Sequence, residues 1–197
     1  MILSLAIFFM AVVIHEFAHG WCAYKLGDPT AKYAGRLTLN PLAHIDPVGT
    51  VLLPLLLTVM RAPIIFGWAK PVPINFWNFK HPRRDMILVG LSGPLSNILL
   101  AFLVSLILKM TLFSPFIRQV LELFVVINLF LAVFNLIPIP PLDGSRVLVG
   151  LLPRNLTFVI ARLEQFGMLI LIVLIWLGLL DSIVWPIVNI LIKALLL

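Results

Sequence analysis

Three ionisable residues near the start of the chain have the spacing of a metal-dependent hydrolase site. His15, Glu16 and His19 form the pattern H-E-x-x-H within a long apolar stretch. Residues four apart lie on one face of an α-helix, so both imidazoles can bind one metal ion while Glu16 lies beside it. Two protein nitrogens favour zinc, which takes a third protein ligand and keeps one position for water. Glu16 is then placed to accept a proton from that water as it attacks a carbonyl group.

The third ligand must come from another part of the chain. The candidate acids are Asp28, Asp46, Asp85, Glu122, Asp143, Glu164 and Asp181. Asp143 is the strongest of these, because it follows a proline-rich run that ends a helix and turns a carboxylate back into a bundle. Two plainer interpretations stay open: the histidines are structural, or Asp143 and Gly144 form an ordinary helix-ending turn.

Composition places these residues in a membrane protein. Of the 197 residues, 62% are hydrophobic and 11% are charged, whereas a soluble domain has about 25% charged residues. So few charges exclude a soluble domain and a disordered chain, and the single cysteine, Cys22, excludes an internal disulfide. The net charge of +6 fits basic residues gathered on the cytoplasmic side of a membrane, and we expect no nucleic-acid partner.

The apolar stretches predict an all-α membrane protein with a single domain over residues 1–197, built as a bundle of four to six transmembrane helices. The expected core helices are 2–24, 86–108 and 119–137, followed by C-terminal helices within 165–197. Between the first two helices, prolines exclude a helix interior, and nearby isoleucine and aromatic residues favour strands. The region 33–80 is therefore predicted to be re-entrant and to contain a small membrane-associated β-hairpin, with strands at 36–40 and 63–75.

Two further motifs accompany the first one. They are Gly93-Pro94-Leu95-Ser96-Asn97 and Asn135-x-x-Pro138-x-Pro140-x-Leu142-Asp143-Gly144. Together with His15–His19 they resemble the site-2 proteases, which are intramembrane zinc metalloproteases. The resemblance implies that His15, His19 and Asp143 bind one Zn²⁺ ion, that Glu16 is the catalytic base, and that Asn135 binds substrate. The segments 35–41 and 67–73 look like the compact bacterial and archaeal branch, which lacks PDZ and CBS domains.

The short apolar run 48–60, interrupted by Pro54, either crosses the membrane or enters it and returns. If it returns, most basic residues lie on the cytoplasmic side, with Lys109 and Arg118 outside. Asp143 then lies level with His15, whereas a full crossing would put the two on opposite faces. We therefore expect re-entry, with the active site toward the cytoplasm, and the resemblance implies a prokaryotic cell (inner) membrane.

Two more polar residues are candidates for substrate binding. His44 lies in a polar stretch and either approaches the active site or makes a hydrogen bond within a turn. Asn97 either contacts substrate or makes an interhelical hydrogen bond. The edge of the predicted hairpin is a third candidate, because an extended substrate paired with it would expose carbonyls that a helix hides. A hairpin that only packs against the bundle is the plainer alternative.

These observations predict zinc-dependent intramembrane proteolysis of transmembrane or membrane-proximal peptide segments. The expected partners are a transmembrane protein or peptide substrate and the lipid bilayer, as in regulated intramembrane proteolysis. The alternatives are a membrane zinc transporter and a proteolytically silent scaffold. A transporter needs ligands along a path across the bilayer, whereas these cluster near one face, and the intact Glu16 argues against a scaffold. The sequence leaves the substrate and the oligomeric state open.

Overall fold

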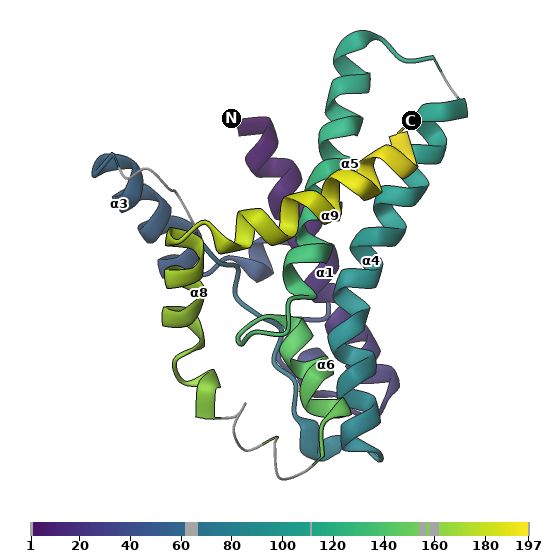
Figure 1. The fold of residues 1–197 in the computed structure, drawn as a ribbon. Helices are drawn as coiled ribbons and strands as arrows, with labels where there is room; N and C mark the ends of the chain where they lie inside the picture. The colour runs from purple at the N-terminus through teal and green to yellow at the C-terminus, as the bar shows by residue number, and fades with distance from the viewer. Residues whose placement is uncertain (1, 62–66, 111, 154–156, 158–161, 197) are drawn as a thin grey trace.

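Three long helices dominate the computed structural model, which describes residues 2–61, 67–110, 112–153, 157 and 162–196. They are α1 (Ile2–Lys25), α4 (Pro82–Met110) and α5 (Pro115–Asn135), and α4 packs against both of the others (Figure 1). Each is long and apolar enough to cross a membrane. All regular elements in the described ranges are helical. The prediction of an all-α integral membrane protein is confirmed.

The boundaries of the long helices follow from local residue chemistry. α1 ends at Lys25, and Gly27 then adopts a φ of 107°, which a residue with a side chain rarely takes. α4 and α5 both begin at a proline, which needs no hydrogen-bond partner for its nitrogen there. Ser114 precedes α5, and its hydroxyl accepts a hydrogen bond from the Ile117 N–H. These ends fix where the polar loops begin.

Shorter helices complete the fold. They are α2 (Thr30–Tyr33), η1 (Pro41–His44), η2 (Pro47–Leu52), α3 (Leu53–Val59), η3 (Phe76–Asn78), α6 (Asp143–Leu151), α8 (Gly167–Trp176) and α9 (Leu179–Leu196). Figure 1 shows α9 crossing the bundle obliquely, with α8 to one side and α6 beside the lower part of α4. The apolar stretches in α3, α8 and α9 are shorter than the three long helices. A total of four to six membrane crossings therefore stays a prediction.

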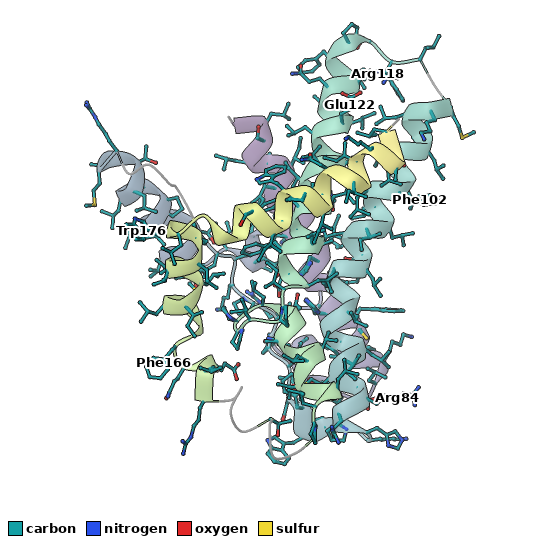
Figure 2. The ribbon with its side chains drawn as sticks, in the orientation of Figure 1. Arg84, Phe102, Arg118, Glu122, Phe166 and Trp176 are labelled. Atoms are coloured by element: carbon teal, nitrogen blue, oxygen red, sulfur yellow. The ribbon has the colours of Figure 1, made fainter. Side chains whose placement is uncertain are left out.

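Apolar side chains fill the bundle and also cover its outside. Ala101, Leu129 and Val188 belong to one buried cluster that joins α4, α5 and α9. Figure 2 shows Phe102 and Trp176 projecting away from the helices, and both are exposed. Large apolar side chains on an outer surface are expected where that surface faces lipid rather than water.

Hydrogen bonds join the residues before α3 to the residues after it. The Lys70 N–H donates to the His44 carbonyl at 3.0 Å, and the Trp68 N–H donates to the Gly49 carbonyl at 3.1 Å. The Thr50 hydroxyl also donates to the Trp68 carbonyl at 2.8 Å. Residues on the two sides of α3 are thus bonded to each other, and re-entry of this segment into the membrane stays a prediction.

The predicted β-hairpin in this region is not supported. The described residues contain no strand, and residues 63–66 of the second predicted strand lie outside the described ranges. Pro71 and Pro73 have no N–H to donate to a ladder. The Arg36 guanidinium donates to the Lys70 and Pro71 carbonyls, and so satisfies acceptors that a neighbouring strand would otherwise use. The strand propensity of this segment is outweighed because its prolines lack N–H donors and because the Arg36 side chain occupies the carbonyls that a neighbouring strand would bind.

Candidate metal centre and active-site cavity

Three ligand atoms from two distant parts of the chain meet at one point. His15 Nε2, His19 Nε2 and Asp143 Oδ2 each lie 3.0 Å from the other two. All three residues are buried, and they form the one group of possible metal ligands found among the described residues. The structure therefore brings together the two histidines and the acid that the sequence singled out.

The turn between α5 and α6 places Asp143. Pro138, Pro140 and Pro141 follow the end of α5, and Asp143 is the first residue of α6. At Gly144, a Cβ atom would overlap the carbonyl oxygens at the end of α5, so only glycine allows α6 to start so close to that helix. The carboxylate is thereby turned back toward α1 instead of continuing away from the bundle.

The outer nitrogens of both imidazoles are held by oxygen acceptors. The His15 Nδ1–H donates to Asn97 Oδ1 at 2.6 Å, and the His19 Nδ1–H donates to the Val89 carbonyl at 2.7 Å. With the proton on Nδ1, each neutral ring directs the Nε2 lone pair inward. Two lone pairs and a carboxylate oxygen then face one another across 3.0 Å, an arrangement that a cation between them would stabilise.

The donor set fits a zinc ion. Two imidazole nitrogens and one carboxylate oxygen are a common catalytic zinc site, with one position left open. Ligands of a tetrahedral zinc ion lie about 3.3 Å apart when the metal–ligand bonds are about 2.0–2.1 Å long, close to the 3.0 Å separations found here. The hydrogen bonds on Nδ1 are the outer contacts that such ligands usually make.

Gly93 lets α4 approach this group closely. A Cβ atom at this position would lie 2.6 Å from His15 Nε2 and closer still to His19 Nε2. Ordinary van der Waals contact begins at 3.4 Å, so any side chain here would overlap the imidazoles. The glycine of the second sequence motif is therefore required by the space that the ligands occupy.

A cavity of about 110 Å³ opens beside the three ligand atoms. Besides the ligands, it is lined by Glu16, Pro71, Val72, Ile74, Asn135, Pro141 and Arg146. Glu16 is half-buried, and its Oε2 atom accepts a hydrogen bond from the Val72 N–H at 2.8 Å. The carboxylate expected to act as the base is thus held at the wall of the same cavity as the ligands.

The segment that carries Val72 is anchored by Asp28. This buried carboxylate accepts hydrogen bonds from the Asn75 N–H and the Asn78 side chain at 2.7 Å, and from Thr30. Burial raises the pKa of Asp28, but the hydrogen bonds outweigh that effect and hold the pKa below its ordinary value. Asp28 was one of seven candidate ligands in the sequence, and the structure gives it this anchoring role.

The remaining predicted site residues lie in different surroundings. Asn135 lines the cavity, and its Nδ2 group donates to the Leu131 carbonyl at 2.9 Å. His44 is fully buried at the end of η1, where its Nε2–H donates to the Thr38 carbonyl at 2.9 Å. Asn97 is also fully buried and contacts His15 rather than the cavity. Of these three, only Asn135 borders the space in which a substrate would lie.

Sequence reasoning missed two polar residues at this site. Arg146 lines the cavity, and its Nη1 atom lies 3.7 Å from Asp143 Oδ1, the carboxylate oxygen that faces away from the histidines. Its position three residues after Asp143 on α6 was the available signal, because such residues share a helix face. Asn128 hydrogen-bonds to Asn97 at 2.7 Å from α5. A polar side chain in the middle of a long apolar stretch was its signal.

The chain matches a known protein family and several of its members. The model of peptidase family M50 matches residues 112–178, which include α5, the proline-rich turn and Asp143. A relative from Bacillus subtilis, named as the zinc metalloprotease YwhC, is 39% identical over 91% of this chain and 83% of its own length. The chain therefore belongs to peptidase family M50, the site-2 protease family, and is a metalloprotease with zinc as its cofactor.

Other relatives carry the same description. One named as the zinc metalloprotease Rip2 from Mycobacterium tuberculosis is 33% identical over 88% of this chain and 66% of its own length. Another, named as the zinc metalloprotease MJ0611 from Methanocaldococcus jannaschii, is 45% identical over 62 residues. The chain thus spans most of the Bacillus relative but only about two thirds of the mycobacterial one. No solved structure matches it significantly.

Proposed function

We propose that this metalloprotease cleaves peptide bonds inside the membrane, in transmembrane or membrane-proximal segments of other proteins. The observation that carries the proposal is the meeting of His15 Nε2, His19 Nε2 and Asp143 Oδ2 within a bundle of apolar helices. His15 and His19 lie ten and six residues before the end of α1. At 1.5 Å per residue the site is about 9–15 Å from the end of that helix, well below a membrane surface.

His15, His19 and Asp143 would hold the zinc ion, and Glu16 would act as the base. When bound, zinc lowers the pKa of water toward neutrality and polarises a peptide carbonyl. Glu16 lines the same cavity and accepts the Val72 N–H through Oε2, so its carboxylate is held in place to accept the proton of the attacking water. After attack, the same carboxylate can pass that proton to the leaving amine.

The segment 70–75 has backbone N–H and C=O groups that can hydrogen-bond to a substrate. The Asn75 N–H faces Asp28, on the side of the protein body, whereas the Val72 N–H faces Glu16 and the cavity. Backbone groups of alternate residues point the same way in an extended chain, which assigns the Ile74 N–H to the cavity side. Among the described residues neither it nor the Val72 carbonyl has a hydrogen-bond partner.

An extended substrate can pair with these free groups. Strand addition would hold the substrate open, so that its carbonyls are not hidden in helical hydrogen bonds. Asn135 borders the same cavity from the end of α5 and would contact the bound chain. The proposed substrate is thus a membrane segment that unwinds locally before it is cut.

The distribution of charge supports an active site toward the cytoplasm of a prokaryotic cell. Figure 2 shows Arg84 at the opposite end of the bundle from Arg118 and Glu122. Arg118 is paired with Glu122 at 3.1 Å, and Lys109 lies in the last turn of α4. The other end of the bundle has Lys25 in the last turn of α1 and Arg83 and Arg84 in the first turn of α4. The more basic end faces the cytoplasm by the positive-inside rule, and it is the end to which the re-entrant segment returns.

The test uses purified protein in liposomes with single-span peptides that differ in how readily their helices unwind. We expect zinc-dependent cleavage within the membrane-spanning part, faster for peptides with helix-weakening residues, and mapped by mass spectrometry. Cleavage only in soluble flanking segments would contradict the intramembrane assignment. Zinc flux into the same liposomes measures the transporter alternative directly.

A further inference from the structure

Two asparagines form a buried chain of side-chain amides behind His15. Asn97 Oδ1 accepts the His15 Nδ1–H at 2.6 Å, and Asn97 Nδ2 donates to Asn128 Oδ1 at 2.7 Å and to the Ala11 carbonyl at 3.3 Å. Asn128 Nδ2 then donates to the Phe124 carbonyl at 2.9 Å. Both asparagines are fully buried. This amide chain joins α1, α4 and α5, and it ends on the backbone carbonyls of Ala11 and Phe124.

The two backbone carbonyls fix the direction of every hydrogen bond in this chain. If Asn128 rotated by half a turn, its Oδ1 atom would face the Phe124 carbonyl and its Nδ2 group would face Asn97 Nδ2. If Asn97 rotated, its Oδ1 atom would face two other oxygens, those of Asn128 and Ala11. Backbone carbonyls cannot become donors, so only the observed orientation pairs each donor with an acceptor.

The orientation of Asn97 decides which nitrogen of His15 carries the proton. With Oδ1 toward the ring, the proton belongs on Nδ1 and the Nε2 lone pair faces His19 and Asp143. With the amide group turned around, an N–H would face Nδ1, which would favour a proton on Nε2 and remove the lone pair that binds metal. The state of the ligand therefore depends on Asn128, which contacts neither the ligand nor the cavity.

We propose that Asn97 and Asn128 are positioning residues that hold His15 in its metal-binding tautomer, with Asn97 acting directly and Asn128 acting through it. The proposal rests on the proposed ligand role of His15. It differs from a packing role, because it assigns Asn128 the single task of orienting the Asn97 amide. When residue 97 is an aspartate, both of its side-chain oxygens are acceptors, so Asn128 is no longer needed to orient it.

The experiment measures the zinc affinity of the purified protein by competition with a chelator of known affinity. We expect Asn97→Leu to lower zinc affinity by about 10–100-fold, the usual loss when the outer partner of a ligand is removed. Asn97→Asp keeps an acceptor for the His15 Nδ1–H and is expected to retain most of the affinity. Asn128→Leu is expected to cause a loss of about tenfold, because the Asn97 amide is then free to turn.

The decisive measurement is Asn128→Leu in the Asn97→Asp background. A carboxylate presents an acceptor whichever way it turns, so the second substitution should now change zinc affinity by less than about twofold. Ser105→Ala is the matched control: it removes a buried hydroxyl from α4 that donates to the Phe102 carbonyl, away from this chain, and should leave zinc affinity unchanged.

Two outcomes would overturn the proposal. An equal loss from Asn128→Leu in both backgrounds would show a packing role, and unchanged zinc affinity in Asn97→Leu would show that the amide chain does not support His15. Thermal unfolding of the zinc-free proteins identifies variants that fail to fold, and the smaller Asn97→Ala and Asn128→Ala substitutions, which also remove the amide, then replace them. Asn128→Asp, protonated in its buried site, keeps both the donor and the acceptor and should retain affinity. Because zinc binding is measured without substrate, failure of the proteolytic function would leave this result unaffected.

Discussion

Replacing Gly93 by alanine tests how closely α4 approaches the metal ligands. The added methyl group would lie 2.6 Å from His15 Nε2, about 0.8 Å inside the 3.4 Å at which ordinary contact begins, and closer to His19 Nε2. Without metal, the imidazoles can rotate away from it. With zinc bound they cannot, so the cost of overlap falls on metal binding rather than on folding.

Overpacking of this kind costs about 1–3 kcal/mol, which corresponds to a loss of zinc affinity of about five- to 150-fold. The measurement is chelator competition on purified protein, with unfolding of the zinc-free form recorded in parallel. Ser105→Ala is the matched control on the same helix, since the hydroxyl that it removes is buried and donates to the Phe102 carbonyl, away from the ligands. Wild-type zinc affinity in Gly93→Ala would refute the convergence of the ligands described above.

Four further predictions concern the residues around the cavity. The pKa of Asp28 is lowered in the folded protein, so its ionised carboxylate stabilises the fold above about pH 4, the pKa of an unfolded aspartate. That stability is lost as the pH falls through the folded-state pKa. Melting curves of Asp28→Asn should therefore show a lower unfolding temperature near neutrality and a smaller loss of stability in acid. Ile74→Pro should slow cleavage at unchanged zinc content, whereas Ile74→Val should not. Arg146→Gln should weaken zinc binding, because Arg146 no longer holds Asp143 Oδ1 away from the histidines, and Arg146→Lys should restore part of it. Removing zinc with a chelator should lower the melting temperature of the wild type, since binding to the folded state alone stabilises it.

The meeting of the three candidate ligands was largely predictable, because its signals are local. The spacing of His15 and His19 follows from the period of a helix, and prolines after α5 mark the turn that carries Asp143. The three long helices were also expected, since uninterrupted apolar stretches have few alternatives in a membrane. These features depend on residues close together in the sequence or on the membrane itself.

Contacts between distant segments were less predictable. Nothing in the local sequence pairs Asn97 with Asn128, because that contact depends on how α4 rotates against α5. The hairpin was predicted from β-branched and aromatic residues, but that propensity depends on a neighbouring strand. Arg36, the first residue of the other predicted strand, satisfies the Lys70 and Pro71 carbonyls with its side chain instead of its backbone. The outcome was set by tertiary contacts that the residue pattern does not encode.

The central claim is that Glu16 drives cleavage within membrane segments of other proteins. It is tested most directly by mapping new protein N-termini in membranes of cells that contain either the wild type or Glu16→Gln, at equal protein level and equal zinc content. We expect N-termini inside transmembrane segments with the wild type, reduced by about 10²–10⁴-fold with Glu16→Gln. The same N-termini at the same abundance in both cells, or their absence from the wild type, would contradict it.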